Sequence, residues 1–123
     1  MDMTTGRLIL ISALAAAAAL LGSASALAGT PKLTGEVGPS FSIEVKQGSK
    51  DVKTLKAGTY LIKVEDKSTI HNFHLIGPGL NKSTTVAFTG EQTWKVKLKR
   101  GTYTYQCDPH AAAGMKGKFR VTG

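Results

Sequence analysis

The sequence contains a single cysteine, Cys107, in a chain of 123 residues. One cysteine cannot form an intramolecular disulfide, so the thiol is either free or bound to a metal. A buried, inert cysteine is the plainest alternative, but a free thiol is a liability in an oxidising compartment unless it is shielded. Metal binding by the thiolate would remove that liability.

Acidic residues are also scarce. The chain has 8 Asp and Glu against 16 Lys and Arg, a formal net charge of +8. Such an excess favours a partner with an acidic surface and makes the rate of encounter sensitive to salt. The basic residues are not interleaved with aromatic ones, as a groove for single-stranded nucleic acid requires, so we expect no nucleic-acid partner.

A long hydrophobic run is missing as well. The longest, from Leu8 to Leu21, is short of the roughly 20 residues that a membrane span needs. Arg7 precedes it and Ala26-Leu27-Ala28 follows it, the pattern of a secretory signal peptide. We therefore predict a signal peptide at residues 1–28, with an uncleaved anchor as the alternative, and one domain at residues 29–123 in the periplasm or outside the cell.

The domain lacks helical periodicity and instead shows alternation of period two, which is typical of half-buried strands. It predicts strands around four sets of inward-facing residues: Phe41, Ile43 and Val45; Tyr60, Ile62 and Val64; Trp94, Val96 and Leu98; and Tyr103, Tyr105 and Cys107. Residues 29–38 are expected to form a lead-in or edge strand. Further strands are expected at 52–55, 70–76, 84–89 and 118–121, with a polar loop at 81–85. We predict an all-β fold, a Greek-key antiparallel β-sandwich of about eight strands.

Three soft metal ligands lie within nine positions, and the first of them comes at the end of the strand that carries Tyr103 and Tyr105. They are Cys107, His110 and Met115. A thiolate, two imidazoles and a weak axial thioether describe an electron-transfer copper site. The second imidazole must come from elsewhere, and His71 and His74 are both candidates. The alternative is a buried cysteine, a surface histidine and a core methionine.

The last third of the chain resembles the plastocyanins and, more broadly, the small blue copper proteins called cupredoxins. Gly-Thr-Tyr at 101–103, Cys-x-Pro-His at 107–110 and Ala-Gly-Met-x-Gly at 113–117 carry the resemblance. It implies a sandwich with one type 1 copper and a first ligand histidine followed by Asn, as in His71-Asn72. The expected ligands are thus His71, Cys107, His110 and Met115, with His74 as the alternative to His71. Strand parity agrees, since His71, Phe73 and Leu75 would share a face.

Around these ligands the resemblance implies that Asn72 ties its segment to the cysteine loop, here through Asp108. The charge of Asp108 would lower the reduction potential unless Lys116 or Lys118 offsets it. We expect His110 to reach the surface as the electron port, within an apolar collar formed by Ala111–Ala113, Pro78 and Leu80.

These features predict an exported protein that shuttles single electrons through copper, one ion per chain, and is not an enzyme. Its partner would be an acidic redox protein such as a cytochrome or an oxidase, and the protein itself a monomer. The alternative is a periplasmic copper carrier or storage protein without redox turnover. A redder copper enzyme with an open metal position is a third reading, while a binuclear copper centre would need two cysteines.

Overall fold

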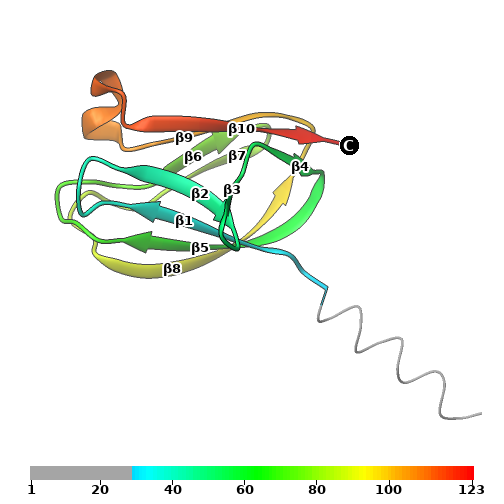
Figure 1. Cartoon of the computed structure of the whole chain (residues 1–123), viewed down its shortest axis with the longest axis horizontal. Coiled ribbons are helices and arrows are strands. Elements are labelled where there is room, and N and C mark those ends of the chain that lie inside the picture. The colour runs from blue at the N-terminus through cyan, green and yellow to red at the C-terminus, as the bar shows by residue number, and fades with distance from the viewer. Residues whose placement is uncertain (1–28) are drawn as a thin grey trace, which may run out of the picture.

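The computed structural model describes residues 29–123, which form two stacked β-sheets (Figure 1). The expected signal peptide lies outside the described residues. The elements are β1 (Lys32–Val37), β2 (Ile43–Gln47), β3 (Lys50–Asp51), β4 (Thr54–Lys56), β5 (Gly58–Asp66), β6 (His74–Gly77), β7 (Leu80–Ser83), β8 (Gly90–Leu98), β9 (Gly101–Gln106), the 3₁₀ helix η1 (Asp108–Ala113) and β10 (Lys116–Thr122). Among these residues, no helix is long and apolar enough to cross a membrane.

Each sheet has five strands. Sheet A has the order β3-β2-β1-β5-β8 and sheet B the order β4-β10-β9-β6-β7. The expected β-sandwich is confirmed, although two pairs, β1 with β5 and β4 with β10, are parallel. The expectation of a lead-in or edge strand near the start was wrong, because β1 lies between β2 and β5 inside sheet A.

The core lies between the sheets and follows the alternation of the sequence. In β8, Trp94, Val96 and Leu98 are buried while the lysines between them are exposed. In β10, Phe119 and Val121 are buried in the same way. Period-two patterning places one face of each strand in the core and the other in water, and this holds for both sheets.

The segment between β5 and β8 differs from its prediction. Residues 70–73 are not part of a strand, and β6 begins only at His74. β7 occupies residues 80–83, where a polar loop was expected, and residues 84–89, expected as a weak strand, form the connection to β8. The polar side chains of β7 are compatible with a strand because β7 is the outer strand of sheet B.

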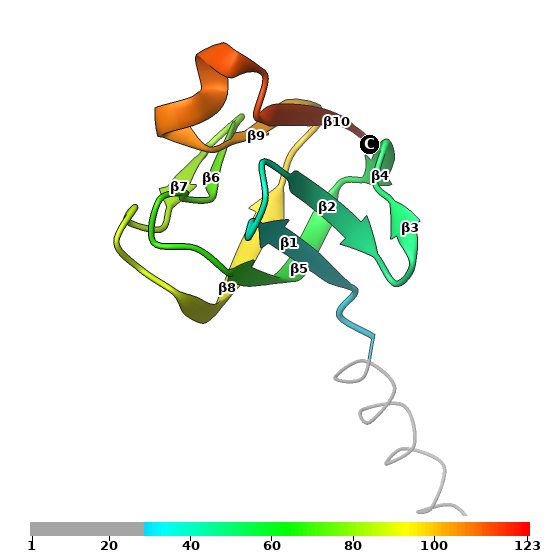
Figure 2. The same cartoon turned by 60° about the vertical axis from the view of Figure 1, so that its left-hand side comes forward.

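Several connections meet at one end of the sandwich. There β9 ends, η1 turns the chain and β10 begins, away from the C-terminus (Figures 1 and 2). His74, the first residue of β6, is paired with Gln106, the last residue of β9. The segment 67–73 therefore reaches the same end as Cys107.

Candidate metal centre

The loop from Cys107 to Met115 closes on itself through backbone hydrogen bonds. The Cys107 N–H donates to the Met115 carbonyl (3.1 Å), and the Met115 N–H donates to the His110 carbonyl (3.2 Å). Pro109 stands in the first turn of η1, where its missing N–H has no cost. Gly114, at φ +98°, allows the left-handed turn that ends η1. The loop is thus closed by its own hydrogen bonds and anchored to a strand of sheet B on each side.

Three donor atoms converge at this loop, two from the loop itself and one from His71 in the segment before β6. The Nδ1 atoms of His71 and His110 are 3.0 Å apart, and the Cys107 Sγ lies 3.6 Å from the first and 3.4 Å from the second. A point equidistant from all three donors in their plane lies about 1.9 Å from each, near the roughly 2.0 to 2.3 Å that protein nitrogen and thiolate ligands keep from zinc-sized metals. The triangle therefore matches the trigonal Cys-His₂ arrangement of a blue copper site.

The two ring nitrogens of His71 have different surroundings. His71 is fully buried, and its Nε2 atom is the one buried side-chain polar atom without a hydrogen-bond partner among residues 29–123. An unsatisfied buried group costs about 1–3 kcal/mol. Nδ1, by contrast, faces Cys107 and His110, so it is the His71 nitrogen that a metal in the triangle would bind.

Two residues of the loop before β2 hold the histidine rings. Gly38 has φ +71°, and a Cβ atom there would lie 3.2 Å from the His71 ring, so the close approach favours glycine. Phe41 packs its ring against His110 at 4.4 Å between centroids and against His71 at 5.3 Å. Alternation had predicted Phe41 in the core, but β2 starts at Ile43 and Phe41 is 63% exposed. Its role at the site could not be read from the pattern.

Asn72 joins the His71 segment to the cysteine loop, as expected. Its Nδ2 donates to Asp108 Oδ2 (2.8 Å), and the Asp108 N–H donates to Asn72 Oδ1 (2.7 Å). Nδ2 also lies 3.3 Å from the Thr84 carbonyl, which it can reach as a donor. Because Asn72 is buried, this two-way tie fixes the position of His71 relative to Cys107.

His74 is tied to the same aspartate from the other side. Its Nδ1 lies 2.8 Å from Asp108 Oδ1, and its Nε2 lies 2.6 Å from Asn81 Oδ1. Both ring nitrogens face oxygen acceptors, an arrangement that suits the doubly protonated imidazolium. The counter-charge of Asp108 is therefore His74, whereas the sequence analysis considered only Lys116 and Lys118 for that role. In this structure His74 does not face the donor triangle.

The pKa directions agree with this ion pair. Burial opposes the charged form of His74, but the hydrogen bonds to Asn81 and Asp108 outweigh it and raise the His74 pKa above its usual value. Burial likewise opposes the charge of Asp108, while hydrogen bonds from Gln106, His74 and Asn72 lower its pKa overall. Gln106 and Asn81, which were not among the predicted site residues, thus help to hold the pair.

The surroundings of His110 differ from the expected collar. His110 is partly exposed, whereas Cys107 is fully buried and Met115 is 4% exposed. Pro78 and Leu80 were expected beside His110, but they lie near the start of β9, where the Tyr103 hydroxyl donates to the Pro78 carbonyl. The exposed large apolar residues of the described chain, Phe41, Ile70 and Val86, lie instead in the loops at the metal end.

The fold and the donor set define a class of protein, a β-sandwich whose residues 29–123 bring two imidazoles and a thiolate together as candidate ligands for a soft metal. A family model described as copper binding proteins, plastocyanin/azurin family, matches residues 40–122. The chain therefore belongs to this family of copper-binding proteins. This confirms the resemblance to cupredoxins that the cysteine loop carries.

Individual relatives agree with this assignment. Over 33 residues the chain is 48% identical to a plastocyanin of Daucus carota, a match that covers 27% of this chain and 34% of that protein. Rusticyanin from Thiobacillus ferrooxidans superposes with a TM-score of 0.52 at 21% identity, over 74% of this chain and 76% of the other. Reduced auracyanin from Roseiflexus castenholzii gives 0.55 at 20% identity, over 76% and 98%. The two structural likenesses show a shared fold.

Proposed function

We propose that this protein is a type 1 copper protein that carries single electrons between redox partners, with His71, Cys107, His110 and Met115 as ligands. The supporting observation is the buried triangle of two imidazole nitrogens and a thiolate, with one imidazole partly exposed. The match of residues 40–122 to a family described as copper binding proteins also supports copper as the metal.

Bound copper would supply a one-electron couple between Cu(I) and Cu(II). The chain itself contributes rigidity, since Gly38 and Phe41 pack against the histidine rings and the Asn72–Asp108 tie holds the two ligand segments together. Ligands that move little between the two oxidation states keep the rearrangement small. Four protein ligands leave no position for a substrate, so we infer no enzymatic role.

His110 serves as the point of electron exit, because it is the partly exposed member of the triangle and Phe41 lies against it at the surface. The apolar loops around it suit a small, short-lived interface, below about 1,200 Å² in total for weak redox encounters. The partner is an acidic redox protein, such as a cytochrome or an oxidase, and its encounter with this basic monomer slows as salt rises.

We further propose that residues 1–28 direct export and are removed after Ala28, so that copper is loaded in the periplasm or outside the cell. Mass spectrometry of protein recovered from that compartment should give a chain that starts at Gly29. A full-length chain retained in the membrane would support the uncleaved anchor instead.

Voltammetry of the copper-loaded protein separates an electron carrier from a copper carrier. We expect a reversible one-electron wave and retention of Cu(I) against the chelator bathocuproine, because Cys107 is fully buried. Cys107→Ser provides the control, in which the wave disappears. No reversible wave together with rapid loss of Cu(I) to the chelator would support the carrier or storage function instead.

A further inference from the structure

The two sheets have very different charge balances. The strands of sheet A contain six Lys or Arg and six Asp or Glu, so their charges cancel. The strands of sheet B contain five Lys or Arg and no acidic residue; the five are Lys56, Lys82, Lys116, Lys118 and Arg120. This separation cannot be seen along the chain, because the strands of the two sheets are interleaved in sequence.

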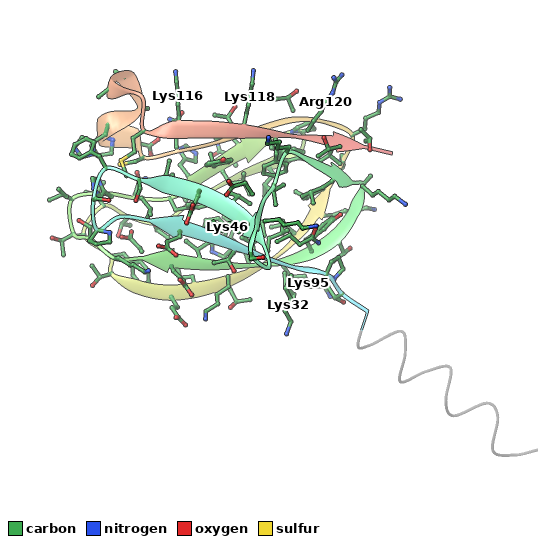
Figure 3. The ribbon with its side chains drawn as sticks, viewed as in Figure 1. Lys32, Lys46, Lys95, Lys116, Lys118 and Arg120 are labelled. Carbon is green, nitrogen blue, oxygen red and sulfur yellow. The ribbon has the colours of Figure 1, made fainter. Side chains whose placement is uncertain are left out.

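Three of these basic residues form a ridge on β10. Phe119 and Val121 point into the core, so Lys116, Lys118 and Arg120 all lie on the outer face of sheet B. Figure 3 shows them pointing away from the sandwich, on the side of η1, whereas Lys32 and Lys95 of sheet A point the opposite way. Lys116 directly follows Met115, so the ridge begins beside the metal end.

The positive charge of the ridge is not neutralised. The ion pairs among lysines and carboxylates of the described chain involve Lys46, Lys63 and Lys67, on sheet A or the turn after β5. In contrast, no ridge residue forms an ion pair within residues 29–123. The nearest acidic residue along the chain, Asp108, is engaged with His74.

The face is also hollowed along its length. One hollow of about 400 Å³ lies between Lys116 and Lys118, and one of about 300 Å³ lies beside Lys118 and Arg120. A third, of about 970 Å³, is bordered by Arg120, Lys56 and Arg100. Open hollows rimmed by cations are suited to the carboxylate side chains of another protein.

We propose that the outer face of sheet B, centred on the ridge Lys116, Lys118 and Arg120, is the docking surface for a carboxylate-rich redox protein. This inference rests on the proposed function and names the face that its partner uses. The partner lies over β10 with its redox centre beside η1, where His110 is partly exposed. An anionic membrane fits less well, because the exposed large apolar residues lie in the metal-end loops and none lies on β9 or β10.

A matched pair of charge reversals tests the location. K118E with R120E changes two outward positions of β10, and K95E with K97E changes two exposed positions of β8 with the same change in net charge. Stopped-flow mixing of each copper-loaded protein with succinylated cytochrome c, an acidic redox probe, measures electron transfer at low salt. Relative to the unmodified protein, we expect the rate of electron transfer to fall about tenfold in the β10 variant and less than about threefold in the β8 variant.

A second readout needs no copper. Titration of isotope-labelled protein with a hexaglutamate peptide should shift backbone amide resonances of β10 and β9 and leave those of β8 unchanged. Equal slowing by the two variants, or amide shifts spread over sheet A, would overturn the proposal. The proposal would also be overturned, in favour of a membrane, by two results together: the unmodified protein binds phosphatidylglycerol vesicles and the β10 variant does not, and the peptide shifts no amide resonances. If the unmodified protein exchanges no electrons with the cytochrome although the peptide shifts the amide resonances of β10, the proposed function is wrong and the docking surface is still supported.

Discussion

His71 and His74 lie three residues apart, yet the fold gives them opposite surroundings. His71 precedes β6, outside any strand, and its ring is fully buried against Cys107 and His110. His74 opens β6, pairs with Gln106 and holds its side chain on the outer face, 18% exposed, between Asp108 and Asn81. A histidine is thus a candidate ligand in the segment outside the sheet, and a hydrogen-bond partner of Asp108 where the backbone belongs to β6. Asn72, between them, is hydrogen-bonded to Asp108, which His74 also contacts directly.

Removal of each histidine should give the largest contrast. We expect His71→Ala to abolish the intense visible absorption of the copper-loaded protein and His74→Ala to preserve it, because of these two histidines only His71 turns its Nδ1 toward the thiolate. Absorption spectroscopy of the two variants at equal copper content measures this. The opposite result would transfer the ligand role to His74.

The hydrogen bonds between Asn72 and Asp108 should have the next largest effect. We expect Asn72→Ala to lower the free energy of unfolding by about 2–3 kcal/mol, because a buried residue loses its bonds to Asp108 in both directions. Asn81→Ala, which removes one bond from an exposed residue, should cost less than about 1 kcal/mol. Denaturant titration of both variants measures the free energies of unfolding. Equal losses of stability would show that the Asn72–Asp108 hydrogen bonds stabilise the fold no more than the exposed bond of Asn81.

Gly38 tests whether the packing around His71 matters to its orientation. Gly38→Ala should cost about 1–2 kcal/mol for the left-handed backbone and should also perturb the copper spectrum, since a Cβ would press on the His71 ring. Gly48→Ala is the control, because Gly48 has φ +61° but open space around it. An unchanged spectrum in both variants would mean that the His71 ring does not depend on this contact.

The His74–Asp108 pair should contribute the smallest effect, and its sign depends on pH. The folded-state pKa of His74 is raised, so its stabilisation is fully present below its unfolded value of about 6.5 and is lost as the pH rises through the raised pKa. The lowered Asp108 pKa contributes stability above about 3.8 that is lost as the pH falls.

Denaturant titration of the copper-free protein and of His74→Ala should therefore differ more at about pH 5.5 than at about pH 9. The difference should stay under about 1 kcal/mol, because the pair is partly exposed and screened. A larger gap at the higher pH would contradict the imidazolium assignment.

The sequence predicted the part of the site that is local in the chain. Cys107, His110 and Met115 lie in one loop, and the alternation in β8, β9 and β10 predicted which residues flank the core. The resemblance of the last third then implied His71 and the Asn72–Asp108 tie, and the structure shows that tie directly.

The features that sequence did not reveal depend on where strands begin and which strands become neighbours. Alternation placed Phe41 in a strand, but the chain enters β2 two residues later, which frees Phe41 to cover His110. It also could not show that Pro78 lies far from His110, or that the acidic residues of the strands all fall in sheet A. Period-two patterns report which side chains share a face and carry no information about strand order.

The visible and electron paramagnetic resonance spectra of the protein after addition of Cu(II) test the central claim most directly. Intense absorption in the red with a narrow copper hyperfine splitting is the expected result, since it reports a thiolate-bound type 1 centre, and Cys107→Ser should remove it while the domain stays folded. A colourless protein, or an ordinary tetragonal Cu(II) spectrum, would contradict the blue copper site and with it the proposed role in electron transfer.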